Sequence, residues 1–534
     1  MQADIVLVNA RLFGSAGEAL AIAGDRISGI GSAADVRGWR GPRTQVVDVA
    51  GGLLVPGFDD AHLHLRHGAL ALDQLDLFGI TELGAIQRAV AAYGAAHAGD
   101  GWVVGRGWFY AAFPGGLPTR QQLDAVIADR PAYFACFDAH SGWANTRALE
   151  LAGIGANTPD PPAGEIVRDA DGNPTGALLE RATALVESVL PQPGPDDVDR
   201  LMGRALSELA RSGITACQDA WADIDDIQRL ERLRDRSGLP VRVRLARELL
   251  PGARPETDRQ LQAFAEEAQQ VRMDAFLQGG IIKSFLDGVV EAGTAWFLDP
   301  YPGTENRGDP RWQPGDIRTG VLEAHRRGWQ VELHAIGTAA VRQALDVYQS
   351  LGPGEAAARR HRVEHIETLH PVDLPRFAEL GVVASMQPYH AVPESSQSDT
   401  WRAALDPAVA DAGWPIASLL RSGAHVCFGS DWPVVPFDPL LGLHAAVNRR
   451  SADGFPPNGF NAAEAVAVAQ AISCFTQGSA FAEHADRERG QLREGMLADL
   501  TVLDRDLLTE GGEAIVGTRV ILTMVGGRMT HRLV

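Results

Sequence analysis

The 534-residue chain is almost free of lysine. Lysine and arginine together number 48, yet Lys283 is the single lysine in the sequence. Both residues serve equally well in solvent, so a coding bias toward arginine explains the loss of lysine from the surface. Arginine stays protonated, whereas a partly buried lysine can lose its proton and act as an amine nucleophile. We therefore expect Lys283 to have a chemical role that arginine cannot fill.

The sequence is also poor in cysteine, in long hydrophobic runs and in basic charge. Its four cysteines, Cys136, Cys217, Cys427 and Cys474, are far apart, which argues against a disulfide framework or a thiolate zinc site. No window approaches the ~20 continuous apolar residues of a membrane span, and the N-terminus lacks a secretory pattern. The net charge of −20 disfavours nucleic acids and anionic membranes as partners. We expect a cytoplasmic protein with a small-molecule ligand, and a homodimer as the default assembly.

Short alternating apolar segments occupy both ends of the chain. They are separated by Gly, Asn and Asp, a pattern that is typical of antiparallel strands. Two small β segments at opposite ends of a chain pair most simply with each other. We therefore predict one small β-sandwich domain made of residues 1–56 and 488–534.

Between these ends, apolar segments alternate with helical patterns. The predicted strands are 53–65, 214–220, 241–246, 279–288, 329–337, 361–368, 381–388 and 425–434. Eight strands separated by helices predict an α/β fold, a (β/α)8 TIM-like barrel over residues 57–487. The gap after the first strand is too long for one crossover, so an inserted subdomain is expected over about residues 68–205.

Polar side chains interrupt the predicted strands where a barrel of this kind carries its catalytic groups. His62 and His64 close the first strand as an H-x-H pair, which can face one metal ion because alternate strand residues share a side. The other candidate ligands are Lys283, His334, His365 and Asp431. A single barrel histidine is more often packed than ligating, and Asp431 could cap a turn. The six groups together predict a metal site.

Aromatic and histidine side chains in the predicted loops are candidate substrate contacts. They are Trp108, His140, Trp296, Tyr389, His390 and Trp432. An aromatic-lined pocket would suit an apolar or aromatic substituent on the substrate, although core packing is the alternative for each tryptophan. The Gly- and Pro-rich segments 288–316 and 389–415 are expected to act as lids.

Several motifs give the chain a family resemblance. F-D-D-A-H-L-H-L, I-K-S-F-L-D-G, E-L-H-A-I-G, R-V-E-H-I-E and G-S-D-W-P-V resemble the ordered signatures of the amidohydrolase superfamily. They are most similar to its YtcJ-like branch, amidohydrolase family 3, which includes N-substituted formamide deformylases. Further similar segments at 143–154, 172–180 and 377–388 extend the resemblance over nearly the whole chain. One departure is Thr338, where the branch usually has Asp.

The resemblance implies a binuclear metal centre. Lys283 would be carboxylated by carbon dioxide and bridge two divalent ions, which requires a neutral amine. His62, His64 and Asp431 would complete one site, and His334 and His365 the other. Zinc is the first choice for imidazole and carboxylate ligands, and manganese, iron and cobalt also fit.

The chemistry that this centre predicts is hydrolysis of a carbon–nitrogen bond. The metals would lower the pKa of a water to give hydroxide, and Asp431 would act as general base. An amide-type substrate, such as an N-substituted formamide or an N-acyl amine, would yield a carboxylate and an amine. Lactone or ester hydrolysis on the same site stays open. So does a mononuclear deaminase, against which Lys283 counts. A non-catalytic regulatory protein predicts damaged ligand positions, and none is damaged.

Overall fold

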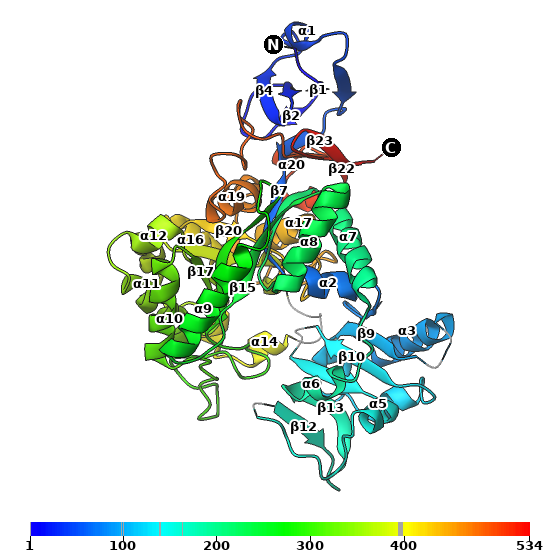
Figure 1. Cartoon of the computed structure of the whole chain (residues 1–534). Coiled ribbons are helices and arrows are strands. Elements are labelled where there is room, and N and C mark those ends of the chain that lie inside the picture. The colour runs from blue at the N-terminus through cyan, green and yellow to red at the C-terminus, as the bar shows by residue number, and fades with distance from the viewer. Residues whose placement is uncertain are drawn as a thin grey trace. The chain divides into compact units, whose positions relative to one another are not determined.

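The computed structural model describes residues 2–97, 99, 101–137, 140–162, 164–392 and 399–533. The chain divides into two compact units (Figure 1). Unit 1 comprises Met1–Arg66, Gly203–Val392 and Ala404–Val534, and unit 2 comprises His67–Met202 and Pro393–Ala403. In the described part of the chain, no helix is long and apolar enough to cross a membrane.

An eight-stranded parallel sheet forms the centre of unit 1. In the order of their pairing, its strands are β7 (Phe58–Leu63), β14 (Ile214–Asp219), β15 (Arg242–Glu248), β16 (Leu277–Phe285), β17 (Gln330–Ala335), β18 (Arg362–His365), β19 (Val383–Met386) and β20 (Val426–Phe428). Each strand pairs with its sequence neighbour in parallel. The sheet confirms the predicted TIM-like α/β fold.

Helices connect these strands, as parallel pairing requires. The main connecting helices are α8 (Ile224–Ser237), α9 (Arg254–Ala268), α10 (Pro314–Arg326), α11 (Thr338–Gln349), α12 (Glu355–Arg359), α13 (Leu374–Leu380) and α16 (Ile416–Arg421), and α17 (Pro439–Asn448) follows the last strand. Helix α8 is typical: Asp223 caps its N-terminus, and Ile227, Leu230 and Leu233 are buried along one face. That apolar stripe is the part of the helix that packs against the core.

The segment expected as one strand over 53–65 is two strands. β6 (Leu53–Pro56) pairs antiparallel with a strand near the C-terminus, and β7 pairs parallel with β14. Gly57 lies between the two strands. A side chain would not fit there, because a Cβ at this position would lie 2.2 Å from the side chain of Thr215. The prediction of one continuous strand was wrong, since one apolar run serves two different sheets.

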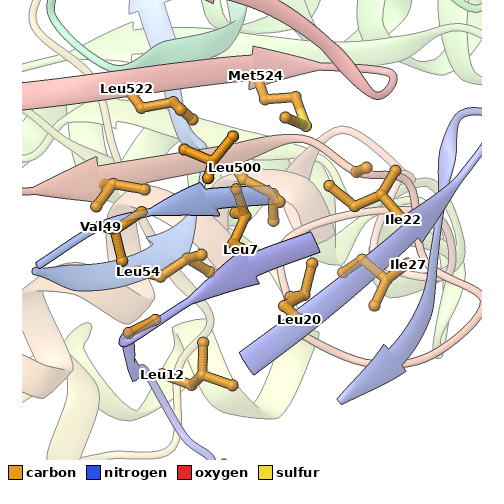
Figure 2. Close-up of a cluster of buried hydrophobic side chains, with 14 of the residues drawn as sticks. Leu7, Leu12, Leu20, Ile22, Ile27, Val49, Leu54, Leu500, Leu522 and Met524 are labelled. Carbon is orange, nitrogen blue, oxygen red and sulfur yellow. The ribbon is translucent and has the colours of Figure 1, made fainter. Parts of the chain in front are cut away.

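Both ends of the chain contribute to two small sheets. One contains β4 (Arg26–Gly31), β3 (Ala19–Ala23), β1 (Ile5–Val8) and β5 (Gln45–Asp48); the other contains β2 (Arg11–Leu12), β6, β21 (Leu500–Leu503), β22 (Val520–Val525) and β23 (Arg528–Arg532). Figure 2 shows Leu7 and Leu20 of the first sheet and Leu54, Leu500 and Met524 of the second in one apolar core. This is the expected β-sandwich of two chain ends, and its boundaries at residues 56 and 488 stay predictions.

Unit 2 has a sheet and a core of its own. The sheet contains β12 (Gly164–Arg168), β13 (Pro174–Glu180), β11 (Ser141–Ala144), β10 (Ala132–Cys136), β9 (Val103–Trp108) and β8 (Leu75–Asp76). Its helices include α3 (Leu83–Ala96), α4 (Arg120–Asp124), α5 (Thr146–Leu151) and α6 (Thr183–Glu187). Phe134 and Trp143 are fully buried among these elements. The fold therefore has an insertion between the first and second barrel strands, as predicted.

Candidate metal centre

The first and last barrel strands meet at a seam that is held by backbone hydrogen bonds beyond their ends. Asp431 N donates to His62 O, and His64 N donates to Trp432 O, each at 2.7 Å. The approach is close enough that a Cβ at Gly429 would lie 2.5 Å from His62 N. The seam thus brings His62, His64 and Asp431 together, although 369 positions separate the outer two along the sequence (431 − 62).

His62, His365 and Asp431 form a group that can hold a metal ion. One ligand atom from each lies within 4.8 Å of the others, and all three side chains are buried. Asp431 Oδ1 lies 3.5 Å from His62 Nε2 and 3.0 Å from His64 Nε2, and Oδ2 lies 3.9 Å from His365 Nδ1. Ligands at about 2.1 Å from a tetrahedral ion would be roughly 3.4 Å apart. Imidazole and carboxylate donors at these spacings fit a divalent cation.

Left-handed backbone conformations bring two of these candidate ligands into position. The φ angles of His365 and Asp431 are 77° and 62°, which cost side-chain-bearing residues of order 1 kcal/mol or more. In a regular strand, consecutive residues point to opposite faces. At the end of β18, however, Glu364 hydrogen-bonds His62 and the neighbouring His365 ring lies 5.0 Å from the His62 ring. The left-handed turn therefore allows two consecutive residues, Glu364 and His365, to contact His62.

Lys283 and His334 join the same group. Lys283 is fully buried, and its Nζ lies 3.5 Å from His62 Nε2. The His334 ring centroid lies 4.4 Å from that of His365. Burial lowers the pKa of Lys283. These contacts connect all six predicted ligand residues into one cluster.

Glu364 holds the imidazole of His62 in its orientation. Its Oε2 lies 2.6 Å from His62 Nδ1. Burial alone would raise the pKa of Glu364, but the Arg362 guanidinium, 2.8 Å from Oε1, together with His62 and Lys283 outweighs burial and holds this pKa well below its usual range. A carboxylate at Nδ1 keeps the proton there and leaves Nε2 as the atom that faces the site.

Arg362 holds a network of buried polar groups inside the barrel. Its guanidinium also donates to Gln218, Ser385 and the carbonyl of Ala61. Gln218 in turn donates to Glu332. The network is enclosed within the protein, because all of these side chains are at most 1% exposed.

The sequence analysis missed this network, although a signal for it was present. E-L-H places Glu332 two residues before His334, and R-V-E places Arg362 two residues before Glu364. Residues at a spacing of two share one side of a strand. Charged residues at that spacing in otherwise apolar strands therefore indicate a polar barrel interior.

Asp287 fastens the loop after β16 to the end of β17. Its carboxylate accepts hydrogen bonds from the backbone N–H groups of Trp296, Ile336 and Gly337 at 2.9, 3.1 and 2.8 Å. Oδ1 also lies 3.6 Å from His334 Nε2. Burial raises the pKa of Asp287 to about 7. The predicted lid over residues 288–316 therefore begins next to Asp287, whose hydrogen bonds hold this part of the loop beside the candidate site.

Two further pKa values suit metal ligation. Burial and the neighbouring His334 lower the pKa of His365 well below its ordinary value, which keeps a nitrogen lone pair available. Burial would raise the pKa of Asp431, but the imidazoles of His62 and His64 outweigh it and hold this pKa well below its usual range. Asp431 is therefore ionised at neutral pH.

His390, a predicted substrate contact, lies close to one of the candidate ligands. Its Nε2 lies 3.8 Å from Asp431 Oδ2, and its Nδ1 lies 3.8 Å from Glu367 Oε1. Its ring is parallel to that of His365 at 6.3 Å. Tyr389, its neighbour in the short helix Pro388–Ala391, is half-buried. The predicted lid 389–415 includes residues 393–398, which lie outside the described residues.

The other predicted contacts have different surroundings. Trp432 is buried against Phe437, with ring centroids 5.0 Å apart, and Trp296 is half-buried. Trp108 belongs to unit 2, where it is fully buried and its indole N–H donates to Phe134 O at 2.8 Å. Packing accounts for this tryptophan.

Two polar positions of the sequence analysis make local contacts. His140 also belongs to unit 2, and its Nδ1 lies 3.1 Å from Glu180 Oε2. Thr338, the residue that departs from the branch pattern, begins α11, and its hydroxyl accepts a hydrogen bond from Leu298 N at 3.2 Å. Thr338 thus binds the loop after β16.

Comparison with known proteins agrees with this site. A model of the amidohydrolase family matches residues 45–531. The N-substituted formamide deformylase of Arthrobacter pascens is 28% identical, with 99% of this chain and 98% of that protein covered. The protein LONG AFTER FAR-RED 3 of Arabidopsis thaliana is 29% identical over 99% of this chain and 92% of its own length.

A solved structure shares the fold. A metal-dependent hydrolase from Pyrococcus horikoshii OT3 superposes with a TM-score of 0.72 at 24% identity, with 96% of this chain and 99% of that chain covered. The family match spans most of the sequence, and the candidate site contains the donor types that such enzymes need. The chain belongs to the amidohydrolase family and is a metal-dependent hydrolase that acts on carbon–nitrogen bonds.

Proposed function

We propose that this hydrolase cleaves an amide-type bond, as in an N-substituted formamide or an N-acyl amine, and releases a carboxylate and an amine. The similarity to a protein named N-substituted formamide deformylase supports this substrate class. The proposed ligands are His62, His64, Lys283, His334, His365 and Asp431, which would hold two divalent ions, zinc by preference. When bound, the ions would lower the pKa of a water and polarise the substrate carbonyl.

The observation that carries the proposal is the position of Lys283. The side chain is fully buried beside His62 and makes no ion pair with a described carboxylate. A charged ammonium is costly there. The neutral amine can instead attack carbon dioxide, which forms an N–C bond and releases one proton. The resulting carbamate offers two oxygens, one for each ion, and no other residue of the sequence can supply it.

Asp431 is the proposed general base. Its carboxylate is ionised, and it is held by its own backbone between His62 and His64. From this position it would take a proton from the attacking water and deliver it to the nitrogen of the leaving amine. The transfer lets the C–N bond break to a neutral amine.

The experiment replaces Lys283 by Met, which keeps the apolar stem of the side chain and removes the amine. Metal per chain is measured by elemental analysis, and hydrolysis is measured on a panel of amides, esters and lactones. We expect two ions per wild-type chain, fewer than two in Lys283→Met, and a loss of activity of about a thousandfold or more.

With both proteins free of metal, the variant should unfold at the same temperature as the wild type or at a higher one, because an apolar side chain replaces a polar amine whose burial is costly. Unchanged metal content and activity would refute the carbamate. Hydrolysis of lactones or esters in preference to all amides would refute the substrate class while leaving the metal centre intact.

A further inference from the structure

A buried side-chain amide without hydrogen bonds lies at the carboxyl end of β19. Gln387 directly follows Met386, the last residue of this strand, and is 1% exposed. Neither its Oε1 nor its Nε2 has a hydrogen-bond partner among the residues that the structure describes. No other side chain in that part of the chain has two buried polar atoms that both lack a partner. Such an amide is costly, because its hydrogen bonds to water are lost and not replaced.

The alternation of side chains along β19 places this amide inside the barrel. Ser385 accepts a hydrogen bond from Arg362 in the buried network, and it is level with Glu364 on the neighbouring strand. Gln387 follows two positions later with an extended backbone, at a φ of −114° and a ψ of 92°. Its side chain therefore lies on the same side as that of Ser385. It is one step nearer the mouth of the barrel, where substrates are bound in this fold.

The backbone around Gln387 contacts two parts of the candidate site. Gly429, which closely approaches His62, donates its N–H to the carbonyl of the residue before Gln387 at 3.1 Å. His390 N donates to Gln387 O, also at 3.1 Å, and His390 Nε2 lies 3.8 Å from Asp431 Oδ2. These contacts hold the buried amide close to the proposed general base.

We propose that Gln387 hydrogen-bonds the N–H and the carbonyl oxygen of the scissile amide, and thereby selects amides that carry an N–H. The inference rests on the proposed function and specifies its substrate as a primary or secondary amide. A side-chain amide offers an acceptor oxygen and two N–H donors, so an occupant that satisfies it must have both a donor and an acceptor. Esters, lactones and tertiary amides have acceptors only.

The pairing favours the tetrahedral intermediate over the substrate. In a planar trans amide, the N–H and the carbonyl point away from each other. Once hydroxide has added to the carbonyl carbon, the C–N bond is single and can rotate. The N–H can then face Oε1 while the oxygen accepts from Nε2. Hydrogen bonds that form together only at this stage raise kcat and leave KM nearly unchanged.

The test replaces Gln387 by Met, which has a similar length and no amide. Its substrates are N-butylacetamide, N-butyl-N-methylacetamide and butyl acetate, which differ only in the group that joins acetyl to butyl. We expect kcat for the secondary amide to fall about 10- to 100-fold. Its KM and the constants for the other two substrates should stay within about threefold. The variant should unfold at the same temperature or higher, because it loses a buried amide that has no partner.

Gln330→Met is the matched control. Gln330 is 3% exposed in β17, but its Nε2 donates to the backbone oxygens of Arg360 and Ala482. Losing these bonds should lower the unfolding temperature and leave the preference among the three substrates unchanged. The same pattern in Gln387→Met would refute the inference, because Gln387 would then act on the fold alone.

Calorimetric binding of two tetrahedral analogues separates the inference from the proposed function. N-butyl methylphosphonamidate has an N–H where butyl methylphosphonate has an oxygen. If no amide is hydrolysed but Gln387→Met weakens binding of the phosphonamidate alone by about tenfold, the inference stands and the proposed function fails. If the variant hydrolyses N-butylacetamide as well as the wild type does, or loses as much activity on butyl acetate, the inference is refuted and the proposed function stands. Neither amide hydrolysis nor a selective loss of phosphonamidate binding would refute both.

Discussion

The barrel interior and the core between the two end sheets are equally buried, but they hold opposite kinds of side chain. In the end sheets, Leu7, Leu500 and Met524 are at most 2% exposed and pack in a cluster of apolar side chains (Figure 2). In the barrel, Lys283 and Arg362 are fully buried together with carboxylates. Apolar packing stabilises without directional demands, whereas buried charges are costly unless each is paired and hydrogen-bonded. The barrel therefore buries charged groups where side chains have to be held in one orientation, whereas the apolar side chains between the end sheets need no particular orientation.

Among the substitutions that test this comparison, the one that removes Arg362 should have the largest effect. Arg362→Met leaves Glu364 and Glu332 buried without the guanidinium that pairs with both of them, so we expect the free energy of unfolding to fall by about 3–5 kcal/mol. Chemical denaturation measures it. Leu500→Ala, in the apolar core, should cost about 2–5 kcal/mol through a cavity. Adding Glu364→Gln should restore part of the loss in Arg362→Met and none in Leu500→Ala. Without that partial restoration, charge pairing is not what Arg362 provides.

Glu364→Gln alone should weaken metal binding in addition to folding, because it also leaves Arg362 without a charged partner on both of its hydrogen bonds to Glu364. The amide keeps the size of the side chain but weakens the charge-assisted bond that orients His62, so we expect metal affinity to fall about 10- to 100-fold. Competition with a chelator of known affinity measures this loss. The matched control is Glu332→Gln, since Glu332 is equally buried and also lies beside Arg362, but no hydrogen bond among the described residues joins it to His62. Equal losses in both variants would contradict an orienting role.

The smallest effect concerns a buried polar group that carries no charge. His361 is fully buried just before β18; Val331 N donates to its Nδ1 at 2.9 Å, and its Nε2 lies 3.1 Å from His325 Nδ1. Burial, followed by His325, lowers the pKa of His361 to about 3. The unfolded chain then binds the proton more tightly than the folded one. Stability is complete above the unfolded pKa of about 6.5 and falls as pH decreases below it.

We therefore expect His361 to contribute a loss of about 2 kcal/mol between pH 7 and pH 5. His361→Asn keeps an acceptor for Val331 N and should remove this part of the pH dependence in denaturation curves. The same substitution at the exposed His97 is the control. A pH profile that is unchanged in His361→Asn would show that another group titrates.

Much of this architecture could be predicted from the sequence, because periodicity and chain order determine it. All eight barrel strands were expected in the order observed. The break at Gly57 was not, since a run of apolar residues does not reveal that it crosses between sheets. His365 is a similar case: it is an obvious candidate ligand in R-V-E-H, yet alternation would place it opposite Glu364. Only the left-handed backbone at His365 brings both toward His62. Trp108 illustrates the reverse, because a core tryptophan and a substrate contact look alike in a sequence.

The seam between the first and last barrel strands has a consequence for how the protein is made. Asp431 meets His62 through a backbone hydrogen bond across 369 sequence positions (431 − 62). A ribosome delivers the chain from its N-terminus, and contacts this distant in sequence are late to form. His62 and His64 are therefore synthesised long before Asp431. The ligand set proposed above is complete only after the last barrel strand has joined the first.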